Sequence, residues 1–546
     1  MIFKALAATL AAALGVAVLA QTTPAAAPNF SADAFRAHVT FLADDLLEGR
    51  EAGTRGYDIA ARYVATQFAA LGAQPAVNGG WFQPVPFIRT VNEGASRLIV
   101  GGQSFGNDAI VFRTSPDPAA LAIDAGVVFV GYGLDIPARG FDDYAGLDVR
   151  GRIVVALSGT PDNVPSDVAA HLNAEKRRMA AARGAIGLIT IRTRAEAVRS
   201  PWRRMTEQSR RAGTAWIGAD GVPFTDGDTM RFSATIDMAP AEALFAGSRR
   251  TLAQVLDDAA RPGARPRGFA LRQQARVERP ASQATRFSSP NVIAVLPGSD
   301  PALAGEYVLL MAHLDGLGIG EARPGDAADA DRIRNGAMDN TTGVATLIEV
   351  ARQMMRDPTR PRRPILVAAV TAEEKGLLGA EYMARNPVVD GRIVSVVNLD
   401  MPILTYDFQD VIAFGAEHST MGPIVARAAA RMNVALSPDP LPTERLFTRS
   451  DHYKFVRQGV PSVFLMTGFA GEGRERFTRF LADTYHGPSD DLALPFNWAT
   501  GARFAQLNYL IAREIADAPE APLWYEGSFF GDVFATGQPR ARRPAP

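Results

Sequence analysis

The chain of 546 residues is long enough for two or three domains with large apolar cores. Its formal charge of −1 and ordinary apolar content argue against a nucleic-acid partner and against a polybasic membrane surface. The absence of cysteine excludes disulfides, thiolate metal sites and lipid attachment at a cysteine.

The start of the chain has the pattern of a secretory signal peptide. Lys4 precedes an Ala/Leu/Val-rich run, and we expect cleavage near Ala20. A retained membrane anchor is the alternative, but the run is shorter than the roughly 20 strongly apolar residues that a span needs. The mature chain is therefore expected to be periplasmic or secreted, without a membrane span.

Two helices are expected after the signal segment. Ser31 is a typical N-cap, and apolar residues follow it at helical spacing at Phe35, Val39, Leu42 and Leu46. A second amphipathic helix runs from about Thr54 and stops at Gly72. Residues 29–94 are assigned to the main domain.

The composition changes at about residue 95, where short β-rich runs alternate with Gly, Pro and Asp turns. Residues 126–130, 152–157 and 187–191 have the composition of strands, and a helix is expected near 174–183. Residues 95–280 are therefore assigned to a separate, β-rich insert.

From about residue 288 the pattern becomes an alternation of strands and helices. The β-branched runs are 291–296, 307–312, 365–371 and 393–399, with helical patterns such as 344–355 between them. This alternation predicts an α/β fold with a mixed, largely parallel central sheet and helices on both faces. Residues 281–520 complete the main domain, and 521–546 form a C-terminal extension whose end, from Arg540, is expected to be disordered.

Five polar segments stand out because most of them lie beside an apolar, β-rich run. They are Met311-Ala312-His313-Leu314-Asp315-Gly316, Met338-Asp339-Asn340, Ala372-Glu373-Glu374, Asn398-Leu399-Asp400-Met401 and Thr484-Tyr485-His486. Strand ends in such sheets meet at one edge, where ligands bind. Each residue alone would be an ordinary surface polar group. Together, imidazoles and carboxylates are the mixed ligands that suit zinc and similar ions.

A two-metal hydrolytic site needs one ligand that bridges both ions. Asp339, at a strand-to-helix turn, suits the bridge because a carboxylate has two oxygens, and His313 and His486 would each bind one ion. Asp315 is better placed to orient an imidazole than to bind metal, although a turn-capping role is the alternative.

The adjacent pair Glu373-Glu374 would repel unless a cation lay between the two carboxylates or one were protonated. At a metal site one of them can bind metal while its neighbour accepts a proton from water. On an exposed helix the same dipeptide would carry no information.

These residues resemble the co-catalytic zinc aminopeptidase family, which includes secreted bacterial leucyl aminopeptidases, aminopeptidase Y and glutamate carboxypeptidase II. The matching motifs are His313-Leu-Asp315, Asn335-Gly-Ala-Met-Asp-Asn-Thr-Thr-Gly343, Thr371-Ala-Glu-Glu-Lys-Gly376, Asn398-Leu-Asp400 and Tyr485-His-Gly-Pro-Ser-Asp490. The similarity extends from about residue 29 to about residue 520 and implies the zinc exopeptidase fold.

The resemblance also implies two zinc ions, or other divalent ions in their place, that share a ligand. The two ligand sets are His313, Asp339 and Asp400, and Glu374, Asp339 and His486. Glu373 becomes the general base, and the peptide bond between Asp339 and Asn340 is expected to be cis.

Two further positions match the family with alternatives left open. Tyr485 corresponds to a residue that hydrogen-bonds the developing oxyanion in some members, and a packed aromatic ring is the alternative. Asp451 and His452 match a segment near the substrate cleft, where a structural hydrogen-bond cluster competes with substrate binding. Residues 95–280 resemble the protease-associated domain, on the segments 128–133 and 151–155.

The expected function is that of an exported di-zinc aminopeptidase acting on peptides. A carboxypeptidase or dipeptidase is the second hypothesis, because arginines that could hold a substrate carboxylate flank the presumed cleft at Arg445, Arg449, Arg474 and Arg476. A catalytically inactive binding protein is the third.

Overall fold

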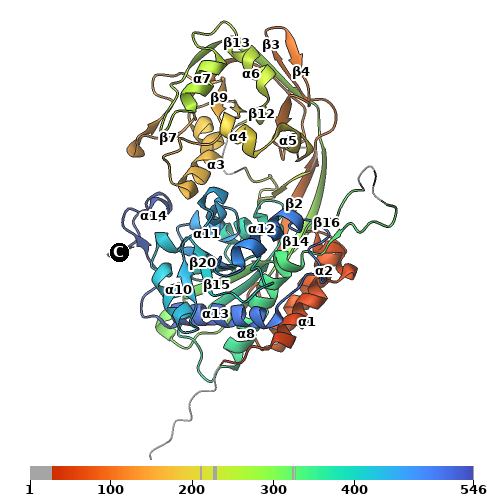
Figure 1. The fold of residues 1–546 in the computed structure, drawn as a ribbon, viewed down its shortest axis with the longest axis vertical. Coiled ribbons are helices and arrows are strands. Elements are labelled where there is room, and N and C mark those ends of the chain that lie inside the picture. Colours follow the sequence, from red (N-terminus) through yellow and green to blue (C-terminus); the bar gives the residue numbers. More distant parts are fainter. Residues whose placement is uncertain (1–27, 209–211, 226–229, 323–324, 326, 545–546) are drawn as a thin grey trace, which may run out of the picture.

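The computed structural model describes residues 28–208, 212–225, 230–322, 325 and 327–544, so the expected signal segment lies outside the described residues. Two large sheets dominate these residues, one in each of two stacked units (Figure 1). We call the lower one in this view the first unit and the upper one the second unit.

The first unit contains a ten-stranded sheet with strand order β11-β2-β14-β18-β15-β19-β22-β20-β21, and β1 pairs with β14. Its strands are β1 (Gln74–Pro75), β2 (Phe82–Val91), β11 (Gly213–Trp216), β14 (Gln283–Leu296), β15 (Glu306–His313), β18 (Ile365–Val370), β19 (Arg392–Leu399), β20 (Asp410–Phe414), β21 (Ala435–Ser437) and β22 (Ser462–Thr467). The four central strands β18, β15, β19 and β22 are parallel, and antiparallel pairs flank them on both sides. The prediction of a mixed α/β sheet is confirmed.

Helices cover both faces of this sheet because its central strands are apolar on both sides. In β15, Val308 and Leu310 point into one core while Leu309 and Met311 point into the other. The first face carries α1 (Ala32–Leu42), α2 (Arg55–Ala70), α8 (Thr342–Arg356), α10 (Met421–Ala430) and α13 (Trp498–Asp517). The second face carries α9 (Leu378–Arg385) and α11 (His452–Val456).

The first helix, α1, begins where expected but ends earlier than expected. Ser31 is the N-cap of α1, where its hydroxyl accepts the N–H of Ala34, as predicted. The helix ends at Leu42, however, and Leu46 is 81% exposed. The carboxylate of Asp44 accepts the Leu46 N–H and starts a separate 3-10 segment, η1 (Asp45–Arg50).

The second unit contains an eight-stranded sheet of order β4-β3-β13-β6-β9-β10-β12-β5. Its strands are β3 (Arg97–Val100), β4 (Gln103–Phe105), β5 (Ile110–Phe112), β6 (Leu121–Phe129), β9 (Ile153–Leu157), β10 (Gly187–Ile191), β12 (Phe232–Ile236) and β13 (Phe269–Arg279). Its helices are α3 (Ser166–Ala182), α4 (Arg194–Arg199), α5 (Trp202–Gln208), α6 (Met238–Phe245) and α7 (Leu252–Ala259). Its identification as a protease-associated domain stays a prediction.

Several links join the units, and two of them lie on different sides. On one side β2 and β14 pair along ten consecutive residues, from Phe82 opposite Val292 to Val91 opposite Gln283, and lead directly into the second unit (Figure 1). On the other side α3 faces the first unit, where the His171 ring lies 2.6 Å from the Tyr453 hydroxyl.

The remaining short elements are β7 (Asp135–Ile136), β8 (Phe141–Asp142), β16 (Gly318–Ile319), β17 (Ile333–Arg334), α12 (Gly473–Asp483), β23 (Trp524–Tyr525), α14 (Phe529–Phe534) and β24 (Arg540–Ala541). β24 pairs with β23, so the first two residues of the tail expected to be disordered are instead part of a strand. None of the helices in the described residues is long and apolar enough to cross a membrane.

Candidate metal centre

The five polar segments converge at the carboxyl ends of the parallel strands. His313 is the last residue of β15, Glu373 and Glu374 lie just beyond β18, and Asp400 follows β19. Because neighbouring parallel strands end at the same edge, these side chains are brought together. The turn before α8 contributes Asp339, and the loop after α12 contributes the last member, His486, to the same edge.

The side chains form two groups of three that share Asp339. In the first group, His313 Nε2 lies 3.1 Å from Asp339 Oδ1 and 3.3 Å from Asp400 Oδ1. In the second, His486 Nε2 lies 3.4 Å from Asp339 Oδ2 and 3.3 Å from Glu374 Oε2. Each group has all its donor atoms within 4.8 Å of one another. Asp339 therefore turns one oxygen to each group, as a bridging ligand would.

Burial and like charges raise the pKa values of the adjacent carboxylates Glu373 and Glu374. Burial, together with the nearby carboxylate of Asp339, raises the pKa of Glu374 to about 8. Burial also raises the pKa of Glu373 well above its usual value, and Asp400 and Glu374 add to this. Burial lowers the pKa of His313, but Asp400 and Glu373 outweigh that effect and raise it well above its usual value. A cation would remove this accumulation of negative charge.

Asp315 has a different role from the one expected for its carboxylate. The ring of His313 is oriented by the backbone of Asp315, whose carbonyl oxygen lies 3.1 Å from Nδ1, while the nearest carboxylate oxygen is 3.9 Å away. A carbonyl only accepts, so Nδ1 carries the proton and Nε2 is free to bind metal. The Asp315 carboxylate instead accepts the N–H groups of Glu373 at 3.0 Å and Glu374 at 3.3 Å.

The bridging residue is held by contacts to which the sequence analysis assigned no role. The carboxylate of Asp490 accepts the backbone N–H of Met338 at 2.7 Å and of Asp339 at 3.0 Å. Buried Arg50 donates to carbonyls on both sides of the site, at Leu42, Leu314, Asn335 and Gly336. Asp490 is the last residue of the motif Tyr485-His-Gly-Pro-Ser-Asp490, so its place near the site could have been predicted. Nothing in the sequence around Arg50 indicates that its side chain holds the site.

The Asp339–Asn340 peptide bond is cis, as predicted. The Asn340 side chain ties this turn to the end of β19, since its Nδ2 donates to the Leu399 carbonyl at 2.9 Å. Its Oδ1 accepts the N–H groups of Gly343 at 3.0 Å and Met401 at 3.1 Å. A Cβ at Gly343 would lie only 2.2 Å from that oxygen, which explains the glycine in the motif.

Ser450 links the segment Ser450-Asp451-His452 to the metal centre. Its hydroxyl donates to Asp400 Oδ2 at 2.6 Å. Asp451 and His452 are fully buried, and the His452 ring packs against Phe464, with ring centroids 5.7 Å apart. This burial favours the structural alternative over direct substrate contact for the two residues.

Tyr485 lies directly on the metal centre. Its ring stacks on that of His486, with centroids 3.7 Å apart. Burial raises the pKa of Tyr485, and the carboxylates of Asp339 and Glu374 raise it further, so its hydroxyl stays protonated. A protonated phenol can donate a hydrogen bond to a developing oxyanion.

A cavity of about 570 Å³ lies between the two units beside Lys375, the residue after Glu374. Its cationic lining residues are Arg113, Arg177, Arg178, Lys375, Lys454 and Arg457. Its acidic lining residues are Glu175 and Glu381. A much smaller space of about 10 Å³, roughly the room for one water molecule, lies against Asp339, Glu374 and His486.

The arginines expected to flank the cleft do not line that cavity. Arg449 and Arg476 form ion pairs with Glu444 and Glu472, and Arg474 lies over an aromatic ring, 5.1 Å from its centroid. Arg445 lies 4.0 Å from Glu196 of the second unit.

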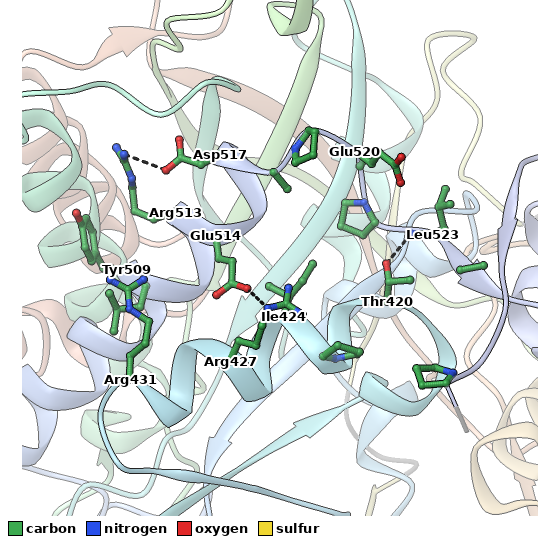
Figure 2. Close-up of a pocket in the computed structure, with 18 of the residues that line it drawn as sticks. Thr420, Ile424, Arg427, Arg431, Tyr509, Arg513, Glu514, Asp517, Glu520 and Leu523 are labelled. Carbon is green, nitrogen blue, oxygen red and sulfur yellow. Dashed lines mark hydrogen bonds and ion pairs between the residues drawn. The ribbon is translucent and has the colours of Figure 1, made fainter. Parts of the chain in front are cut away.

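A larger cavity of about 1030 Å³ lies away from the metal centre, between α10, α13 and the C-terminal segment (Figure 2). Several of its charged side chains pair with each other, as in Arg427 with Glu514 and Arg513 with Asp517. Its lining includes none of the residues of the two metal-ligand groups.

In a comparison with known protein families, residues 291–512 match the model of peptidase family M28. Leucine aminopeptidase 1 of Trichophyton rubrum is 26% identical over 194 residues, which are 34% of this chain and 49% of that protein. A probable zinc metalloprotease of Pyrenophora teres f. teres is 33% identical over 113 residues, 20% of this chain and 22% of that protein. The chain thus spans less than half the length of these curated relatives.

A solved structure extends the likeness to nearly the whole chain. An aminopeptidase from Aneurinibacillus sp. strain AM-1 superposes with a TM-score of 0.50 at 20% identity, covering 94% of this chain and 98% of that one. This match shows the fold. The resemblance expected from the motifs is confirmed by the family match over residues 291–512.

Proposed function

We propose that this chain, whose residues 291–512 match peptidase family M28, is an exported di-zinc aminopeptidase that removes amino-terminal residues from peptides. The observation that carries the proposal is the shared Asp339, which turns a different oxygen to each of two histidine-containing ligand groups. Five protein ligands are more than one catalytic zinc, which typically has three, can use.

The donor set fits two zinc ions in chemistry and in spacing. His313, Asp339 and Asp400 would hold one ion, and Glu374, Asp339 and His486 the other. When bound, such a pair supplies Lewis acidity to the substrate carbonyl and acidifies a water molecule.

The protein's own part in the reaction is proton transfer and positioning. Glu373 is not in either ligand group, and burial raises its pKa, so it is suited to accept the proton from water and pass it to the leaving amine. Tyr485 would donate to the oxyanion, and Asp315 holds the Glu373 backbone in place.

The substrate end is assigned to the amine because leucine aminopeptidase 1 of Trichophyton rubrum is among the proteins similar to this chain. The test compares a free peptide with its N-acetyl and C-terminal amide forms, and mass spectrometry detects the products. Loss of turnover on acetylation, with the amide still cleaved, supports an aminopeptidase.

A carboxypeptidase is the second candidate, and the cation-rich cavity beside Lys375 favours it. Guanidinium and ammonium groups there could hold a substrate carboxylate, in competition with the carboxylates that already pair with four of them, Arg178, Lys375, Lys454 and Arg457. The opposite result of the same comparison, with amidation abolishing turnover and acetylation tolerated, would establish this function. Failure of all three peptides in the zinc-loaded protein would favour an inactive binding protein.

Export is proposed from the first twenty residues of the sequence. Expression of the whole chain in a bacterial host, followed by fractionation and amino-terminal sequencing, tests it. A mature chain that begins after about Ala20 and lies outside the cytoplasm supports export, whereas an intact Met1 in the cytoplasm contradicts it.

A further inference from the structure

A third group of metal-ligating side chains lies between the two units, apart from the metal centre. Asp167 is in the first turn of α3 in the second unit. Glu417 and His418 are in η5 (Ala416–His418), between β20 and α10 of the first unit. One donor atom from each of the three lies within 4.8 Å of the others. Figure 1 shows α3 on the side of the second unit that faces the first.

The distances within this group are those of ligands around an ion. His418 Nε2 lies 3.6 Å from Asp167 Oδ2 and 3.5 Å from Glu417 Oε1. Two atoms that each lie about 2.1 Å from a tetrahedral zinc ion are about 3.4 Å apart. The corresponding distances from His486 to Asp339 and Glu374 are 3.4 and 3.3 Å.

A charged hydrogen bond does not explain the group. A protonated imidazole that donates to a carboxylate would lie about 2.7–2.9 Å from it, and neither distance is that short. Nε2 of His418 and Oδ1 of Asp167 are both buried without a hydrogen-bond partner among the described residues. Native proteins rarely bury polar atoms in this way unless a water or an ion completes them.

The surroundings hold the imidazole in place and add negative charge. The His418 ring packs against Phe447 and Phe530, each with a centroid distance of 5.0 Å. A third carboxylate, that of Asp439, is close enough that Asp167 and Glu417 add to the effect of burial in raising its pKa. In the part of the chain that the structure describes, no arginine or lysine forms an ion pair with any of the three carboxylates.

We propose that Asp167, Glu417 and His418 form an additional divalent-cation site that fastens α3 of the second unit to the first unit. One imidazole nitrogen with carboxylate oxygens suits Zn²⁺ or Mn²⁺ better than a thiolate-preferring ion. Because its ligands come from both units, the ion joins surfaces that are far apart in sequence. The site is independent of the proposed peptidase activity, since it shares no ligand with the metal centre.

The first test counts zinc ions per chain by elemental analysis after chelator treatment and reloading of the full-length protein. We expect three ions in the unchanged protein and two in His418→Gln. Glu417→Gln should bind the third ion at least tenfold more weakly, and this exposed carboxylate can be changed without disturbing the core. Glu444→Gln, an exposed carboxylate nearby in the first unit, is the matched control and should keep all three ions.

The number of zinc ions bound per chain distinguishes an absent third site from an absent two-zinc centre. Loss of one ion in His418→Gln supports the third site, whatever number the unchanged protein binds. Equal counts and equal zinc affinities in His418→Gln, Glu417→Gln and the unchanged protein would overturn it.

A second test measures hydrogen exchange in α3, which does not depend on catalysis. Zinc should slow the exchange of α3 amides severalfold in the unchanged protein and in Glu444→Gln, but not in Glu417→Gln. The same zinc effect in Glu417→Gln as in the unchanged protein would refute the tether.

Discussion

The contact between Asp490 and the bridging turn gives a quantitative prediction. The two oxygens of Asp490 accept the N–H groups of Met338 and Asp339. In Asp490→Asn the shape is kept, but only one oxygen remains and an amide NH₂ group faces the other N–H. Losing one hydrogen bond to a charged acceptor costs about 1.5–3 kcal/mol of folding stability. A substitution that disturbs a residue supporting a metal ligand typically weakens metal binding about 10–100-fold.

Zinc affinity is measured by competition with a chelator, and the free energy of unfolding of the metal-free protein by denaturant titration. Both are measured at pH 8, because burial raises the pKa of Asp490 to about 7 and the carboxylate must be ionised. Asp491→Asn is the control, since among the described residues that carboxylate accepts the Ala493 N–H, outside the site. If Asp490→Asn kept the zinc affinity and the stability of the unchanged protein, the idea that Asp490 positions Asp339 would be wrong.

Two further predictions concern the metal centre, and a third concerns His171, at the contact between the units. Glu373→Gln should lower kcat by about 10²–10⁴-fold with nearly unchanged zinc content, because it removes a proton acceptor and no ligand. Glu374→Gln should instead lose zinc. If Glu373→Gln lost zinc and Glu374→Gln did not, the roles of base and ligand would have to be exchanged. Asp339→Asn should weaken both ions of the metal centre together in a zinc titration, whereas loss of only one would show that Asp339 does not bridge. Burial lowers the pKa of His171 to about 4 from the usual 6.5, so the unfolded state binds the extra proton between these values. The contribution of neutral His171 to the free energy of unfolding should therefore be fully present above about pH 6.5 and should fall by about 2–3 kcal/mol towards pH 4. Denaturant unfolding of His171→Gln across that range should show a smaller fall in the free energy of unfolding.

The metal centre could be predicted because its ligands follow parallel strands. The order of these strands in the sheet does not change the edge at which they end. Any arrangement that keeps β15, β18 and β19 parallel brings His313, Glu374 and Asp400 to one edge. The apolar, β-branched composition of those strands is a local signal, and so is the polar residue after each of them.

The supporting contacts could not be predicted because they depend on partners distant in sequence. Arg50 has a left-handed backbone with φ of 51° and reaches carbonyls more than 250 residues away, which no local pattern records. The pairing of β11 with β2, which returns residues Gly213–Trp216 to the first sheet, is likewise a tertiary contact. The end of α1 at Leu42 was missed because apolar periodicity continued to Leu46 while Asp44 favoured a new turn.

The unbroken ladder between β2 and β14 has a mechanical consequence. Ten paired residues make a strut about 30 Å long, whose cross-strand hydrogen bonds resist shear and stretching. This pairing should therefore resist sliding of the second unit towards or away from the first sheet. Thr90, near the end of β2, also lines the cavity of about 570 Å³ that lies between the two units. Insertions or deletions in these two strands should therefore change the size of that cavity.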